Sequence, residues 1–518
     1  MLSGPPPGVP VVLLGLLALF LVLVVVYDLV QTKHAILRNF PIVGHFRYLL
    51  EAVGPELRQY IVTDNDEERP FSRDQRSWIY ASAKRQNNLA GFGTDNDLDH
   101  CVDYPVLCHA AFPYRDPVPE EERAAGGWSL PCAKVLGGPR GRRHAFRPAS
   151  IVNTSAMSFG SLSGPAVRAI NEGCARAGCL QNTGEGGISP HHLQGGRLIW
   201  QLGTGYFGAR TADGDLDLDK LVARAAEHPV AAIELKLSQG AKPGMGGVLP
   251  GAKVTPEIAA IRDVPVGQTV HSPSFHRAFS DVDGLLDLIE TIADRTGLPV
   301  GLKTAVGDLD FFRTLARRIR ETGRSPDHLQ IDGGEGGTGA GPRAWADHVA
   351  LPFHLAFPRV YRIFAEEGVH EDLVWIGSGR LGLPERAMLA MGMGCDMIAV
   401  AREAMMAVGC IQAQRCHTGN CPAGVASQNP WYSRGLVPAD KAPRLANYVV
   451  ELRKELLGLA HCTGAAHPGL IGLERFEILE GRLEGRCARD VFGYQAGWGL
   501  PSAADREAVV ALMEGRAA

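Results

Sequence analysis

The sequence predicts an α/β protein built on a (β/α)₈ barrel, with an N-terminal transmembrane helix and short N- and C-terminal extensions. From Ile151 onward, short apolar runs alternate with longer amphipathic segments, as expected for a parallel sheet whose buried strands lie between helices. Most runs end in Gly, Ser, Lys or Asp, and a barrel gathers such residues at the carboxyl ends of its strands. We expect strands within residues 151–157, 230–237, 299–306, 328–332, 373–376 and 397–401. A doubly wound sheet is the alternative, but no convincing G-x-G-x-x-G follows a strand and opens a helix.

The first barrel helix is predicted in detail. Ser163 is a candidate N-cap, and Gly178 closes the segment. Apolar residues between them recur at 167, 170, 174 and 177, on one face of a helix.

The uncharged run Val9–Val26 predicts a membrane-spanning helix. As a helix it would rise roughly 27 Å, close to the thickness of the hydrocarbon layer. A cleaved signal peptide is the alternative, but no Lys or Arg precedes the run and no small-residue cleavage motif follows it. The first cations after it are Lys33, Arg38 and Arg47, which favour a cytoplasmic location for the rest of the chain. We therefore expect a single span in the inner (cytoplasmic) membrane, with the catalytic domain in the cytoplasm.

The chain divides into four predicted parts: an anchor (1–30), a connector and N-terminal extension (31–150), the barrel with a cysteine-containing loop (151–430) and a C-terminal helical extension (431–518). The net charge of −4 gives no case for a nucleic-acid partner.

Three cysteines form the sharpest local signal. Cys410, Cys416 and Cys421 are separated by five and four residues, and Pro422 follows the last. Thiolates spaced in this way on a loop can converge on iron, and three of them suit a three-iron cluster. Zinc would want a fourth ligand, for which His417 is the only neighbour. Three buried thiols without metal are an equally good interpretation of the spacing alone.

Two loops carry candidate catalytic groups. A predicted buried strand runs into Lys236, Gln239 and Lys242 beside a glycine-rich stretch. Two cations and an amide there suit a substrate carboxylate or an electron-rich flavin ring. Glu185 lies between glycines at a possible strand end, where a carboxylate can orient an amine or receive a proton. A solvent-facing turn is the alternative for Glu185.

Glycine-containing runs follow two later predicted strands, at residues 333–342 and 377–380, and residues 399–402 end the next strand. The last two βα loops of barrel enzymes often form a phosphate site from backbone N–H groups. An FMN phosphate fits this pair of loops, with Arg380 or Arg402 assisting.

Several segments together resemble the FMN-binding synthase domain of glutamate synthase. They stand in family order from Ile151 to about Pro430: residues 155–161, 182–187, 236–244, 253–257, 336–339 and 410–428. The resemblance implies a (β/α)₈ barrel, FMN and a 3Fe–4S cluster on the three loop cysteines. It also implies that 2-oxoglutarate condenses with ammonia and that reduced FMN delivers hydride to the 2-imino acid.

The resemblance assigns roles to individual residues. Lys236, Gln239, Lys242 and Arg262 would hold the flavin and a dicarboxylate, and Glu185 would face the amine. The residues expected to line FMN are Ser155, Ala156, Met157, Ser158, Lys303, Asp332, Gly333, Gly377, Ser378, Gly379, Arg380, Ala399, Val400 and Ala401.

The sequence also departs from the family pattern. Met245 stands where a glutamate is usual, and Gly377–Arg380 replaces an Asp-containing loop. A membrane span stands where glutamine-using members carry an amidotransferase domain, so we expect no glutamine hydrolysis by such a domain in this chain. No NAD(P) fingerprint is evident, so a separate electron-donor protein is expected.

We expect a membrane-anchored oxidoreductase that reductively aminates 2-oxoglutarate or a related 2-oxo acid with externally supplied ammonia or amine. The alternatives are an N-alkyl amino-acid (N-methylglutamate-like) synthase, a membrane-bound flavin and iron–sulfur electron-transfer subunit, and a structural membrane protein whose barrel has lost its chemistry.

Overall fold

The computed structural model describes residues 9–31, 33–481 and 483–516, in two compact units, Met1–Arg76 and Ser77–Ala518. The first unit contains α1 (Val9–Val30), α2 (Ala35–Asn39), α3 (Val43–Leu57) and a π-helical turn, η1 (Arg58–Val62). Within α1, Val11–Val30 has a mean hydropathy of 2.8 and is long and apolar enough to cross a membrane. A signal sequence near an N-terminus would share these properties, so length and composition do not decide between the two.

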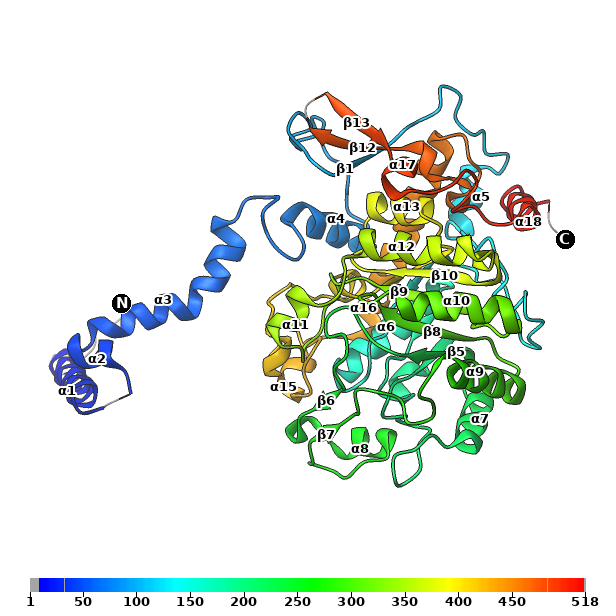
Figure 1. Cartoon of the computed structure of the whole chain (residues 1–518). Coiled ribbons are helices and arrows are strands. Elements are labelled where there is room, and N and C mark those ends of the chain that lie inside the picture. Colours follow the sequence, from blue (N-terminus) through cyan, green and yellow to red (C-terminus); the bar gives the residue numbers. More distant parts are fainter. Residues whose placement is uncertain (1–8, 32, 482, 517–518) are drawn as a thin grey trace. The chain divides into compact units, whose positions relative to one another are not determined.

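The second unit contains a closed barrel of eight parallel strands, which confirms the predicted fold class (Figure 1). The strands, in order around the barrel, are β2 (Val152–Thr154), β3 (Gln181–Asn182), β4 (Leu198–Leu202), β5 (Val230–Lys236), β8 (Val300–Ala305), β9 (His328–Asp332), β10 (Val374–Ser378) and β11 (Met397–Val400). Six of them fall in the predicted runs. β3 has only two residues, both polar, and neither it nor β4 was predicted.

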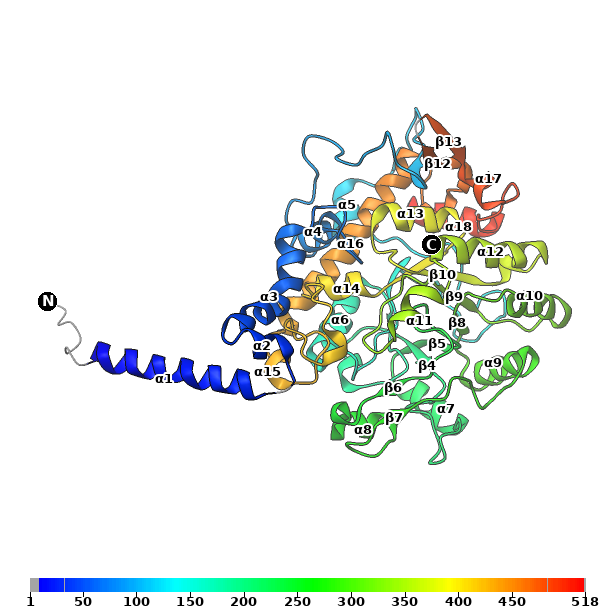
Figure 2. The same cartoon turned by 60° about the vertical axis from the view of Figure 1, so that its left-hand side comes forward.

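Helices surround the barrel, and Figure 2 shows α7, α9, α10 and α12 along one side of it. The ring includes α6 (Gly164–Ala177), α7 (Leu218–Glu227), α9 (Val282–Thr296), α10 (Asp310–Thr322), α12 (Phe353–Glu366), α13 (Pro384–Gly392) and α14 (Arg402–Ala407). The predicted details of α6 are confirmed: the Ser163 side chain accepts from the Ala166 N–H, and Gly178 ends the helix with φ of 67°.

An insertion between β5 and β8 contributes to the site. It contains β6 (Val248–Leu249), η3 (Gly251–Lys253), α8 (Pro256–Arg262) and β7 (Val270–His271), and β6 and β7 form a two-stranded antiparallel ladder. The Thr255 side chain caps α8 by accepting from the Ile258 N–H. This cap fixes where α8 begins, and Arg262 is its last residue.

The two extensions are joined by a small sheet, seen at the top of Figure 1. β1 (Tyr104–Leu107) pairs antiparallel with β12 (Phe476–Gly481), which pairs with β13 (Glu484–Cys487). The C-terminal extension is therefore not purely helical, although it contains the long α16 (Pro438–Cys462) and α18 (Ala503–Met513). α16 packs on α6 at Gly173, where an added Cβ would lie 2.7 Å from the Leu445 side chain. The remaining short helices are α4 (Arg73–Lys84), α5 (Glu120–Ala125), α11 (Arg343–His348), α15 (Pro430–Ser433) and α17 (Ala488–Phe492).

Candidate active site

One carboxylate and one lysine form the centre of the site. Lys236 is the last residue of β5, and Glu185 lies three residues after β3. Lys236 Nζ is 2.9 Å from Glu185 Oε1 and donates to Gln239 Oε1 at 2.7 Å. The structure thus brings Glu185 together with two predicted residues, Lys236 and Gln239, that lie more than fifty positions further along the sequence.

Two further predicted cations surround Glu185. Lys242 and Arg262 are buried, and burial lowers the pKa of both groups, to about 10 for Arg262, while Glu185 opposes the shift. Burial of Glu185 would raise its pKa, but Lys236, Lys242 and Arg262 together hold the pKa of this carboxyl below its usual value. At neutral pH the site therefore holds three cations and one anion, a net charge of +2 that favours an anionic ligand with two charges.

The protein binds one side of the Arg262 guanidinium, and its Nε–H has no hydrogen-bond partner among the described residues. Its Nη2 donates to the Phe159 carbonyl at 3.1 Å, and its guanidinium lies 5.1 Å from the centre of the Phe207 ring. Its buried Nε–H has no hydrogen-bond partner in the described part of the chain. An unpaired buried donor is costly, so this group is well suited to bind a ligand carboxylate.

Glycine backbone closes around the Glu185 carboxylate. A Cβ added at Gly203, just after β4, would lie 2.4 Å from Glu185 Oε2. One added at Gly247 would lie 3.6 Å from Oε1. A side chain at position 203 would therefore displace the carboxylate.

Residues predicted to line FMN meet at the carboxyl ends of β8 and β9. Lys303 Nζ lies 3.6 Å from Asp332 Oδ2, and the same oxygen accepts from the Gly240 N–H at 2.8 Å. The Gly333 N–H donates to the Ser378 carbonyl, also at 2.8 Å. The loop that carries Gln239 and Lys242 is thereby joined to the glycine-rich loop after β9.

The strands on the other side of the barrel complete this rim. The Ser155 N–H donates to the Val400 carbonyl at 2.8 Å, which joins the ends of β2 and β11. The next residues in the loop after β2 are Ala156, Met157 and Ser158. Ala399, in contrast, is part of the apolar core of the barrel, and Ala401 precedes α14.

Gly377 lies differently from its neighbours. A Cβ at this position would lie within 2.9 Å of Leu381, Cys395 and Phe353, so the position faces the packed helical layer. Gly379 adopts φ of 146°, and its added Cβ would lie 3.4 Å from the Gly333 Cα. The loops after β9 and β10 therefore touch at Gly379, whereas Gly377 can reach a cofactor only through its backbone.

Arginine gathers beside these loops. Burial lowers the pKa of Arg402, and burial together with Arg386 and Arg402 lowers that of Arg380 to about 10. Arg402 Nη2 donates to the Glu335 carbonyl in the loop after β9. Partly buried cations that repel one another are stabilised by an anion, and a phosphate would supply one.

The cysteine loop lies beside the glycine-rich loop that follows β9. Cys416 lies in a short 3₁₀ turn, and burial together with nearby Cys421 raises the pKa of its thiol. A Cβ at Gly339 would lie 3.3 Å from the Cys416 Cβ, so this loop contacts the glycine-rich loop after β9. In residues 9–31, 33–481 and 483–516, no three His, Cys, Asp or Glu side chains are grouped so that they could hold a metal ion. The donor chemistry of the Cys410, Cys416 and Cys421 thiols suits iron, but among the described residues these three thiols are not grouped so that they could hold a metal ion.

His276 is a site residue that was not predicted from the sequence. Its Nε2 lies 2.9 Å from the Lys236 carbonyl, and its Nδ1 lies 3.0 Å from the Tyr206 hydroxyl. Burial lowers the pKa of His276, so the ring is neutral and its Nε2–H donates to Lys236 while Nδ1 accepts from Tyr206. A lone histidine forty positions from Lys236 gives no sequence signal for this contact.

A second unpredicted group lies inside the barrel. Glu234 is fully buried, accepts from Asn182 Nδ2 and Gln201 Nε2 at 2.7 Å each, and lies 3.4 Å from His328 Nε2. Burial would raise the pKa of Glu234, but His328 and Lys303 hold it below its usual value. This buried carboxylate was not predicted from the sequence, because a single Glu within an apolar run still predicts an ordinary buried strand.

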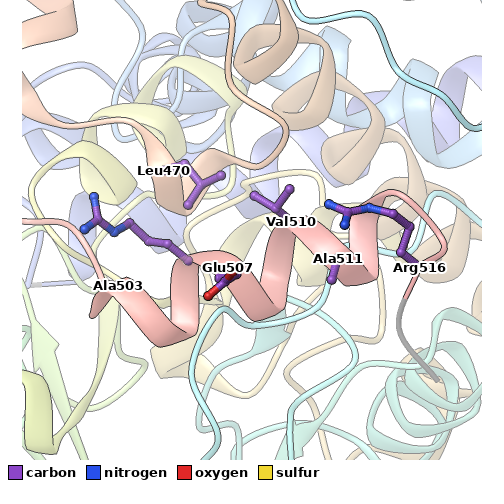
Figure 3. Close-up of a pocket in the computed structure, with 7 residues that line it drawn as sticks. Leu470, Ala503, Glu507, Val510, Ala511 and Arg516 are labelled. Carbon is purple, nitrogen blue, oxygen red and sulfur yellow. The ribbon is translucent and has the colours of Figure 1, made fainter.

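The surface pocket in Figure 3 is not this site. It has a volume of about 470 Å³ and lies along α18 in the C-terminal extension. Its lining is Leu470, Ala503, Arg506, Glu507, Val510, Ala511 and Arg516, none of which is a predicted site residue.

Comparisons with known proteins identify the family to which the chain is similar. The sequence profile of the family "Conserved region in glutamate synthase" matches residues 141–466. The glutamate synthase large subunit-like protein YerD of Bacillus subtilis is 36% identical over 488 residues, which cover 88% of this chain and 92% of that protein. The archaeal glutamate synthase [NADPH] of Methanocaldococcus jannaschii is 34% identical over 311 residues, or 59% of this chain, and the match spans 58% of its length. A mandelate oxidase mutant solved with a monooxide FMN adduct is 14% identical, with a TM-score of 0.42 over 84% of this chain and 100% of its own.

The fold and the family match define an FMN-dependent oxidoreductase on a (β/α)₈ barrel. The chain belongs to the glutamate synthase family.

Proposed function

We propose that this chain reductively aminates 2-oxoglutarate or a closely related 2-oxo dicarboxylic acid with ammonia. The observation that carries the proposal is the buried group of Lys236, Lys242 and Arg262 around the single carboxylate of Glu185. A 2-oxo dicarboxylate brings two negative charges, which balance the net charge of this group.

The two outer cations bind the substrate carboxylates in this proposal. Arg262 offers its Nε–H, which has no partner among the described residues, and the buried Lys242 lies near the Glu185 carboxylate. Charge-assisted hydrogen bonds from such groups fix both the position and the direction of a dicarboxylate.

Glu185 acts on the nitrogen. Its lowered pKa keeps it ionised at neutral pH, so it can accept hydrogen bonds from ammonia and remove a proton as the C–N bond forms. Lys236 fixes the position of this carboxylate, and Gln239 and the His276–Tyr206 pair hold Lys236 in place. FMN, when bound, supplies the hydride that reduces the resulting 2-imino acid.

The flavin site is proposed at the rim formed by the ends of β2, β8, β9, β10 and β11. The partly buried Arg380 and Arg402 fit its phosphate, and Lys303 with Asp332 fits the polar edge of its ring. The residues assigned to this rim are those predicted from the sequence, except that Ala399 lies in the apolar core and Gly377 contributes its backbone only.

Three further features belong to the proposal. Cys410, Cys416 and Cys421 would hold a 3Fe–4S cluster, supported by their spacing and by the proximity of Cys416 to Cys421. α1 would anchor the chain in the inner membrane with the catalytic unit in the cytoplasm, supported by its length, its apolarity and the cations that follow it. A separate protein would deliver electrons.

Turnover with an artificial reductant tests the function. Glutamate should form from 2-oxoglutarate and ammonium, and substitution of methylamine for ammonium should lower kcat/KM severalfold. Higher kcat/KM with methylamine would make the chain an N-alkyl amino-acid synthase. If the protein turns over none of the pairs of 2-oxo acid and amine but still reduces an artificial electron acceptor, it would be an electron-transfer subunit.

A further inference from the structure

The helix that follows the proposed span exposes a continuous apolar face. Around α3, at about 100° per residue, six apolar side chains fall within a sector of about 120°. They are 38% to 74% exposed and comprise Val43, Phe46, Leu49, Leu50, Val53 and Leu57, here named the α3 face. Arg47 and Glu51, which form an ion pair of 2.8 Å, lie outside this sector. Soluble helices bury such a face, so this one requires a partner.

The start of α3 is fastened to the end of α1. The buried Asp28 carboxylate accepts from the Ile42 N–H at 3.0 Å and lies 2.9 Å from His45 Nε2. Figure 1 looks nearly along α1, whereas α3 runs across the picture. A helix held crosswise at the end of a transmembrane span lies along the membrane surface.

The charges change sign where the helical segment ends. Between residues 31 and 62 the charged side chains are Lys33, Arg38, Arg47 and Arg58 against Glu51 and Glu56, which sum to +2. Directly afterwards come four acidic residues, Asp64, Asp66, Glu67 and Glu68. Basic side chains are attracted to an anionic leaflet and acidic ones are repelled. The pattern therefore places residues 33–62 at the bilayer surface and directs the chain away from it at residue 64.

We propose that α3 is an interfacial helix whose α3 face inserts among the lipids of the cytoplasmic leaflet. The inference rests on the membrane anchorage proposed above and adds a second, surface-lying contact to it. A single short apolar helix would be a weak anchor alone, but it adds to the span and restricts how the span rotates.

Lipid quenching of a fluorescent amino acid tests the proposal in the full-length protein. Dansylalanine is placed at one position at a time: Phe46 on the α3 face, Glu51 outside that face and Leu17 in the span. The protein is reconstituted into vesicles of zwitterionic and anionic phospholipid that carry a nitroxide near the headgroup or deep in the acyl chain. Unchanged flavin content shows that each variant is folded.

The shallow nitroxide should quench the probe at position 46 at least about twofold more than the probe at 51. The deep nitroxide should quench the probe at 17. Equal quenching at 46 and 51, or no quenching at 46 while 17 is quenched, overturns the interfacial helix and leaves the span intact. In the second case a second copy or the catalytic unit covers the α3 face. No quenching at 17 overturns the membrane anchorage and the interfacial helix together.

Discussion

Replacing Arg262 by alanine should weaken binding of the 2-oxo dicarboxylate far more than binding of FMN. The variant loses a buried guanidinium whose Nε–H has no partner among the described residues and whose neighbour Glu185 is already paired with Lys236. Loss of a charge-assisted hydrogen bond costs about 1.5–3 kcal/mol, which corresponds to a roughly 10- to 150-fold rise in Kd.

The assay is a titration of 2-oxoglutarate against the oxidised flavin spectrum, followed by KM under an artificial reductant. Arg313→Ala is the matched control, because Arg313 is an exposed arginine paired with Asp310 in its own helix. Because Arg262 also donates to Phe159 and contacts Phe207, the melting temperature is measured for both variants. An unchanged Kd in folded, flavin-loaded Arg262→Ala protein would refute the assignment of Arg262 to the substrate.

Four further predictions concern the same structure. Glu185→Gln should lower kcat more than it raises the KM for the 2-oxo acid. The pKa of Glu185 in the folded protein lies below its usual value of 4.5, so the ion pairs of this carboxylate stabilise the fold above that pH. The difference in urea midpoint between the unaltered protein and Glu185→Gln should therefore shrink as the pH falls below about 4.5. Gly203→Ala should lower turnover by displacing the Glu185 carboxylate, whereas Gly458→Ala, with no atom within 4 Å of its added Cβ, should leave turnover unchanged. Cys416→Ser should lose most of the iron and keep FMN, and equal iron content by elemental analysis would exclude a cluster at this loop. Removal of residues 1–30 should release the protein from alkaline-washed membranes with its flavin retained, and full-length protein that high salt alone removes would argue against a span.

The sequence was most informative where a residue type and its strand position act together. Lys236, Gln239 and Lys242 follow one buried strand, so their convergence could be predicted from the barrel geometry alone. The two strands that were missed, β3 and β4, show the limit: β3 is two polar residues, and pairing in the closed barrel rather than local propensity makes it a strand.

Long-range contacts made by single residues were not predictable. His276 reaches Lys236 because the insertion folds back over the barrel, and Gly203 contacts Glu185 because β4 neighbours β3. The α3 face could have been recognised from its periodicity, but its exposure and its link to Asp28 required the structure.

The central claim is that the cation group around Glu185 binds a 2-oxo acid that is aminated and reduced. It is tested most directly by following flavin absorbance after anaerobic photoreduction of the purified protein. The account predicts that 2-oxoglutarate and ammonium added together re-oxidise the flavin and yield one glutamate per flavin, while either one alone leaves it reduced. A flavin that stays reduced with both present, and that an artificial electron acceptor re-oxidises at once, would contradict the account.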